Sequence, residues 1–359
     1  MAHIWQMLRS GKAPCADGLR IPSRSGHADR RRQLADAAVW ITIGAAAIVI
    51  IAAALLTPVR IEWRSFLAPG STAALLAAAG WWYRTRRNDP RLGAVINCTA
   101  QIIGFAAVAA PLSYIAAMAG FPLWDATLDA WDRQLHFDWT QATTFVATHP
   151  ALRIVLFLAY SSFAVQTVTT VMSLGIAGQL ERLSAFISAF VCTTLITIVG
   201  SAVFPAAGPY LFLAVQPETI NGFLPVSSTS WPVFLGLRGG TMHTVYGLHS
   251  EGIITFPSLH AALSALFAIA LWRVPVVRWI ALGLNAAMLI ATPAYGSHYV
   301  VDVIAGVATS ITCWFAASRF IAVGSIGAAQ VAMIADTPSI VPGAVSEAES
   351  APSRNLESV

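Results

Sequence analysis

Charged residues are scarce in this chain. Asp, Glu, Lys and Arg together make up 11% of its 359 residues, whereas hydrophobic residues make up 57%. Mean hydropathy is +0.67. Soluble domains carry about 25% charged residues, so the composition excludes a soluble globular protein. We therefore expect an all-α, polytopic membrane protein.

Lysine and cysteine are also scarce. The only lysine is Lys12, close to the N-terminus, so a cation that meets an anion elsewhere in the chain must be an arginine. The spacing of the four cysteines suggests neither a disulfide nor a zinc site, and we expect them to be small buried residues; they are Cys15, Cys98, Cys192 and Cys313. Residues 1–35 lack the apolar region of a cleavable signal peptide, so the first span is expected to act as an anchor.

Long apolar runs are abundant. Runs long enough to cross a bilayer of about 30 Å occur at 37–58, 66–83, 94–119, 151–176, 183–204, 257–273, 277–295 and 299–321. We therefore predict a helical bundle of about eight spans. The second and sixth runs are close to the lower limit of about 17–20 residues, so re-entrant or interfacial segments are the alternative for both.

The arginines predict the orientation. They cluster in residues 1–35 and in the 84–91 loop, which the positive-inside rule places in the cytoplasm. Eight spans then leave both termini inside, with residues 205–256 and 293–298 outside. An anionic inner leaflet accounts for these arginines and for the pI of about 9.1, so no nucleic-acid partner is expected. The preference for Arg over Lys and the many alanines suggest a bacterial genome, hence a bacterial inner membrane.

Two short motifs lie where a predicted outer loop meets an apolar run: FPSLH at 256–260 and GSHYVVD at 296–302. His298 and Asp302 are four residues apart, so a helix beginning near His298 places both on one face. A carboxylate bound to one ring nitrogen fixes the tautomer and leaves the other nitrogen as a nucleophile. With His260 as a second imidazole, one histidine can attack while the other donates a proton, as phosphoryl transfer without a metal requires.

Three further residues are candidate phosphate ligands. Arg238, in LRGG, has a planar fork that can hold two phosphate oxygens. Ser258 and Ser297 lie at predicted helix N-termini, where backbone amides bind anions. The chain has no H-E-x-x-H or comparable spacing, so we expect neither a metal nor a cofactor.

Two segments on the predicted outer side, 121–139 and 205–256, have patterns that predict a structure or a role. Residues 121–139 have helical periodicity, and we expect an amphipathic helix lying flat in the outer interface, with its aspartates on one side and its Trp and Leu residues on the other; a floor that guides a lipid head group is the alternative. Residues 205–256 form a long loop, which is usually functional. Pro205 and Pro209 should end the fifth span.

These motifs resemble those of the type 2 phosphatidic acid phosphatase superfamily, of the form K-x6-R-P, P-S-G-H and S-R-x5-H-x3-D. Residues 257–260 match the second motif, with Leu in place of Gly. His298 and Asp302 match the third, but Ala291 and Thr292 stand at its Ser-Arg positions. The first motif is absent in its lysine form. FPAAGPY, PSLH and HYVVD look most like the branch of inositol phosphorylceramide synthase.

The resemblance covers roughly residues 121–320 and implies a mechanism. His298 would form a phosphohistidine, Asp302 would orient it, and His260 would protonate the leaving oxygen. A lipid phosphatase resolves the intermediate with water, and a phosphotransferase with a second alcohol; the expected partners are thus a lipid phosphate and the bilayer. The expected organisation is a basic tail (1–35), accessory spans (36–120), a catalytic membrane domain (121–322) and a second tail (323–359).

Other functions remain open at this point. A head-group transferase is nearly as well supported as a phosphatase, and the missing third-motif arginine also allows an inactive relative. A transporter could use His298 and Asp302 as a proton relay. However, it would need charged residues deep within several spans, whereas here they cluster at one edge. A zinc hydrolase lacks the expected ligand spacing.

Overall fold

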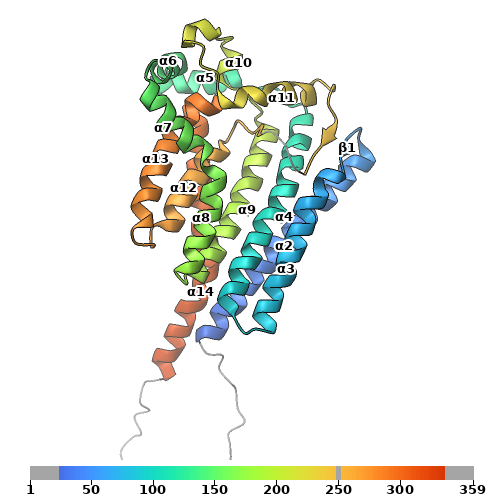
Figure 1. Ribbon diagram of the computed structural model, residues 1–359, viewed down its shortest axis with the longest axis vertical. Coiled ribbons are helices and arrows are strands. Elements are labelled where there is room, and N and C mark those ends of the chain that lie inside the picture. The colour runs from blue at the N-terminus through green and yellow to red at the C-terminus, as the bar shows by residue number, and fades with distance from the viewer. Residues whose placement is uncertain (1–23, 248–251, 336–359) are drawn as a thin grey trace, which may run out of the picture.

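The computed structural model describes residues 24–247 and 252–335. Long helices run along the length of the molecule, and short helices cover one end (Figure 1). The long helices are α2 (Arg24–Leu56), α3 (Arg64–Thr85), α4 (Pro90–Met118), α7 (Pro150–Ser161), α8 (Phe163–Ile176), α9 (Leu180–Val203), α12 (Leu259–Leu271), α13 (Val277–Gly296) and α14 (Val300–Ala335). The covering elements are α5 (Asp125–Gln134), α6 (Trp139–Thr148), α10 (Pro209–Phe212), η1 (Pro217–Ile220), η2 (Val226–Thr229) and α11 (Trp231–Arg238).

The two strands are only two residues long. β1 (Arg60–Ile61) pairs in parallel with β2 (Thr244–Val245). This pairing ties the α2–α3 connection to the loop that follows α11. The fold is therefore all-α, as predicted.

Five helices of the described chain are long and apolar enough to cross a membrane: α2, α4, α9, α13 and α14. The bent pair α6 and α7, which meet at 110°, would bring the number to six if it counts as one span. The sequence predicted about eight spans. Helices occupy all eight predicted positions, but the fourth predicted span, 151–176, is divided between α7 and α8. α12 has only 13 residues and α3 falls short of the apolarity of a span, which matches the weakness of the second and sixth runs.

Both ends of the described chain lie at the same end of the bundle, together with the α3–α4 connection (Figure 1). That connection contains the arginine-rich residues 84–91. The short helices and both histidine motifs lie at the opposite end. α2 begins at Arg24 and α14 continues to Ala335, so helix extends past the predicted tail boundaries at 35 and 323. The rest of both predicted tails lies outside the described residues, as do the loop residues His249 and Glu251.

Local sequence accounts for the helix ends near the site. α9 ends at Val203, directly before Phe204 and Pro205, because proline cannot continue a helix. Pro209 is the first residue of α10, where its missing N–H costs nothing. Pro205 therefore follows the end of the span as predicted, whereas Pro209 opens the next short helix.

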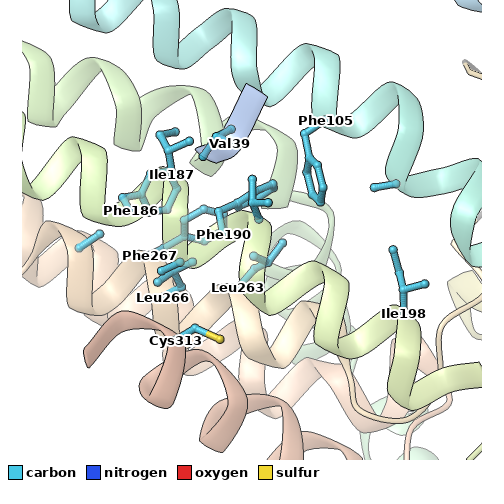
Figure 2. Close-up of a cluster of buried hydrophobic side chains, with 14 of the residues drawn as sticks. Val39, Phe105, Phe186, Ile187, Phe190, Ile198, Leu263, Leu266, Phe267 and Cys313 are labelled. Atoms are coloured by element: carbon cyan, nitrogen blue, oxygen red, sulfur yellow. The ribbon is translucent and has the colours of Figure 1, made fainter. Parts of the chain in front are cut away.

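α9 lies at the centre of the bundle. It packs against α4 and α2 on one side and against α12 and α14 on the other. The main hydrophobic core forms where these helices meet, and Phe186, Phe190 and Phe267 are among its residues (Figure 2). Large apolar side chains also cover the outer surface, as in Leu55 and Leu75. Such a surface is expected where helices face lipid.

Candidate active site

His298 lies in the three-residue link between α13 and α14. Its Nδ1 is 3.3 Å from Oδ2 of Asp302, one helical turn along the chain. The exposed fraction is 3% for His298 and 0% for Asp302. The spacing of four residues thus brings imidazole and carboxylate together, out of contact with solvent.

Asp302 has a second task at the start of α14. As the third residue of the helix, it accepts a hydrogen bond of 2.9 Å from the Tyr299 amide at the N-cap position. This is half of a capping box. The same oxygen therefore closes the first helical turn and holds His298.

The His298 ring is suited to be a nucleophile. Burial lowers its pKa to about 4, and a hydrogen bond to the Thr255 backbone opposes the shift. The ring is therefore neutral near pH 7. With its proton on Nδ1, facing Asp302, the lone pair is on Nε2. That nitrogen lies 3.3 Å from the Ser258 hydroxyl.

Ser258 is the N-cap residue of α12. Its hydroxyl accepts a hydrogen bond from the Ala261 amide, and its own amide donates to the Asp302 carbonyl. α14 comes very close here: a Cβ on Gly306 would lie 2.3 Å from the Ser258 carbonyl oxygen. Pro257 directly precedes this cap residue.

His260 occupies the first turn of α12. Its ring stacks on Tyr160 of α7, with centroids 4.2 Å apart and planes 13° apart. Phe163 contacts the same ring edge-on at 5.5 Å. His260 and His298 both line one cavity, so the structure brings the two predicted histidines together.

Sequence reasoning missed Tyr160. A Cβ on Gly296 would lie 2.8 Å from the Tyr160 hydroxyl and 2.9 Å from His298 Nε2. The tyrosine hydroxyl and the nucleophilic nitrogen therefore approach the same point, which the glycine leaves open. No motif surrounds Tyr160 in the sequence, and nothing short of the fold connects it with residues 100 positions away.

Two of the three aspartates of α5, Asp125 and Asp132, are buried, and Asp129 is partly exposed. Asp132 is 3% exposed and accepts hydrogen bonds from the Val300 and Val301 amides, at 2.8 and 3.0 Å. These are the first amides of α14, which a carboxylate stabilises. Burial raises the pKa of Asp132, and the two backbone donors oppose the shift.

Asp125, 2% exposed, fixes the loop after α9. It accepts hydrogen bonds from the Ala207 and Gly208 amides and from the Tyr299 hydroxyl, the last at 3.0 Å. α5 therefore holds both the loop after α9 and the start of α14, directly after His298. Asp125, Leu128 and Asp132 are spaced as one helical face, and all three are buried; that spacing is the signal the sequence held.

All three predicted phosphate ligands lie outside the cavity lining. Ser258 is fully buried and contacts His298 Nε2 from behind the lining. The Ser297 hydroxyl accepts a hydrogen bond of 3.0 Å from the Tyr210 amide, so it holds α10 against the link. Arg238 donates to the Phe121 carbonyl at 2.6 Å. The guanidinium also lies over the Phe234 ring. Burial lowers the pKa of Arg238, and nearby Asp125 opposes the shift.

The cavity has a volume of about 430 Å³, within the usual range of about 300–1,000 Å³ for small-molecule sites. Its polar end contains the two histidines, and its walls come mainly from α4, α9, α11 and α12. Among the described residues, no group of three or more His, Cys, Asp or Glu side chains is placed to hold a metal ion.

Comparisons with known proteins agree with this geometry. A search of curated proteins and a search of solved structures each gave no match. A family profile described as PAP2 superfamily matches residues 126–316, which include α5, α12, both histidines and Asp302. The match does not single out the inositol phosphorylceramide synthase-like branch. The chain belongs to the PAP2 superfamily, whose members in general are phosphatase-type lipid phosphoesterases.

Proposed function

We propose that the protein cleaves a phosphoester or diphosphate bond of a membrane lipid through a phosphohistidine at His298. The observation that carries the proposal is the buried His298–Asp302 pair, in a histidine that lines a cavity together with His260. A nucleophile, its orienting carboxylate and a second imidazole are the parts that metal-independent phosphoryl transfer needs.

In the first step, His298 Nε2 attacks phosphorus. The N–P bond forms as the bond from phosphorus to the lipid oxygen breaks. The leaving oxygen takes a proton from His260, whose protonated form is favoured by the negative charge of the bound phosphate, and Asp302 stabilises the positive charge that develops on His298. The products are a phosphohistidine and a lipid alcohol or a lipid monophosphate.

In the second step, an acceptor hydroxyl attacks the phosphohistidine. His260 takes the acceptor's proton, the N–P bond breaks, and neutral His298 is restored. Water as acceptor gives inorganic phosphate, and a second alcohol gives a new phosphoester. The apolar cavity walls favour an alcohol that arrives from the bilayer, whereas the open point beside Gly296 suits a small acceptor such as water.

The phosphate contacts follow from the same geometry. The Ser258 hydroxyl, 3.3 Å from Nε2, is suited to donate to a phosphate oxygen on His298. Ser297 acts indirectly by holding the link. Arg238 reaches the phosphate only after it releases the Phe121 carbonyl, and it would then supply the charge that the third motif lacks.

The arginine-rich α3–α4 connection lies at the end of the bundle opposite the histidines (Figure 1). The positive-inside rule puts this connection in the cytoplasm. This supports an active site on the outer face of a bacterial inner membrane.

The experiment measures phosphate release in detergent, with EDTA present, from lipid monophosphates and diphosphates. The wild type is compared with His298→Ala and with a control, His243→Ala, whose backbone carbonyl bonds to Arg60 far from the cavity. A 32P-labelled substrate, quenched at alkaline pH, tests for phosphohistidine. We expect release and labelled protein in the wild type and control, and neither in His298→Ala. Label retained by His298→Ala would overturn the mechanism.

A further inference from the structure

The cavity below the histidines is partly built by a helix outside the family match. We infer that it binds the apolar chain of the phosphate-bearing lipid, that α4 forms one wall of the site, and that Phe105 and Phe190 set the longest chain it admits. This inference rests on the proposed function, because it places the phosphate of that lipid at His298.

α4 ends before residue 126, where the family match begins. It nevertheless contributes five residues to the cavity lining: Phe105, Ala106, Ala109, Ala110 and Ser113. α9 faces them with Phe190, Thr194 and Ile198, and α12 adds Leu259 and Leu263 below His260. The family core thus supplies the histidines, and an accessory helix completes the space beneath them.

The cavity extends well into the bundle. Its lining runs from Ser113 to Phe105 on α4 and from Ile198 to Phe190 on α9. Eight residues of helix correspond to about 12 Å. The cavity therefore extends along the helices, away from the histidine end. An alkyl chain attached to a phosphate at His298 needs space in this direction.

The polar side chains in these walls are satisfied within their own helices. The Thr194 hydroxyl donates to the Phe190 carbonyl at 2.9 Å, and the Ser113 hydroxyl donates to the Ala110 carbonyl at 2.7 Å. They need no partner from a ligand. The deep part of the cavity therefore suits methylene groups, and the polar atoms that would recognise a head group lie at the histidine end.

An aromatic pair closes the deep end. Phe105 and Phe190 meet edge to face, with centroids 6.3 Å apart. Packed core side chains, including Phe186 and Phe267, lie beyond them (Figure 2). A chain that reaches the pair can extend no further without displacing this core, so affinity should rise with chain length and then stop rising.

The first test locates the chain directly. Dodecyl phosphate with a diazirine at the end of its chain is photolysed with His298→Ala protein in detergent, and labelled peptides are mapped by mass spectrometry. We expect label on α4 between Phe105 and Ser113 or on α9 between Phe190 and Ile198. Label confined to outward-facing residues, such as those of α3, would overturn the inference. Because no turnover is needed, the result is independent of the proposed reaction.

The second test narrows the cavity. Ala106→Phe fills its α4 wall, and Ala78→Phe on the exposed face of α3 is the matched control. Each buried methylene is worth about a fourfold gain in affinity, which is ~0.8 kcal/mol. Excluding two methylenes should lower the ratio of kcat/KM for dodecyl phosphate to that for butyl phosphate about 15-fold in Ala106→Phe, with no change in Ala78→Phe. An unchanged ratio in both variants would contradict the assignment. Phosphate release by the wild type, measured in parallel, reports separately on the proposed function.

Discussion

Replacing Asp132 with alanine tests whether α5 holds the active-site link. The substitution removes the acceptor of the Val300 and Val301 amides. A buried donor left without a partner costs about 1–3 kcal/mol, and loss of a helix cap costs about 0.5–2 kcal/mol. Alanine also removes the cost of burying the Asp132 carboxylate, the same desolvation that raises the pKa of Asp132, and this offsets part of the loss. We therefore expect a net loss of about 2 kcal/mol.

Asp129→Ala is the matched control on the same helix. Asp129 pairs with Arg133, which is exposed, at 2.8 Å, and such surface pairs contribute about 0–1 kcal/mol. At about 2–4 °C per kcal/mol, Asp132→Ala should lower the Tm in detergent by about 4–8 °C, and the control by about 4 °C at most. Intrinsic tryptophan fluorescence during a thermal ramp measures both.

Activity provides a second readout of the same change. Displacing His298 by about 1 Å can reduce the rate about 100-fold, so phosphate release well below the Tm should fall by about 10- to 100-fold in Asp132→Ala and stay near wild type in Asp129→Ala. Equal Tm values and equal rates in the two variants would refute the role of α5 as a clamp.

Three further predictions concern the link itself. Gly296→Ala places a methyl group within 3 Å of the Tyr160 hydroxyl and the His298 ring, so phosphate release should fall at least about 10-fold; Gly283→Ala on the same helix meets no atom within 4 Å and should retain wild-type rates. Asp302→Asn leaves the Tyr299 N–H with an acceptor but removes the negative charge beside His298. We expect kcat to fall about 100-fold or more and the Tm to drop by only a few degrees; a large drop in Tm that accompanies the loss of kcat would indicate a purely structural carboxylate. The pKa of His298 is about 4 in the folded protein against an ordinary 6.5, so between these pH values the unfolded chain binds more protons than the folded one. The free energy of unfolding should therefore fall as the pH drops from about 6.5 to about 4, by up to about 3 kcal/mol. His298→Gln removes this contribution. The Tm of the wild type minus that of the variant should therefore be smaller at pH 4.5 than at pH 7.5, and a difference that does not change with pH would contradict the assigned burial.

The parts of the site that sequence could predict are those encoded by short spacing. The interval between His298 and Asp302 equals one helical turn, so their contact depends only on α14 beginning where it does. Pro205 follows α9 and Pro209 opens α10, so each affects only the residues beside it, and the end of α9 was predicted correctly. Local rules of this kind hold because the atoms involved are bonded close together along the chain.

The parts that could not be predicted depend on packing between distant segments. Tyr160 stacks on His260 only because the end of α7, which packs against α13, meets the first turn of α12. The aspartates of α5 were expected on one side of an interfacial helix. Asp125 and Asp132 are instead buried, where they accept hydrogen bonds from the amides after α9 and at the start of α14. Arg238 lies close to the motifs in sequence, but the Phe121 carbonyl and α5 determine where its guanidinium lies.

The double use of Asp302 links the chemistry of the site to the order in which the chain is completed. One carboxylate oxygen both closes the first turn of α14 and orients the imidazole, so His298 has no fixed orientation until that turn has formed. α14 is the last long helix of the described chain. A nascent protein with its earlier helices inserted but α14 unformed would carry both histidines and still be inert, and reactivity would begin only when biogenesis of the bundle is complete.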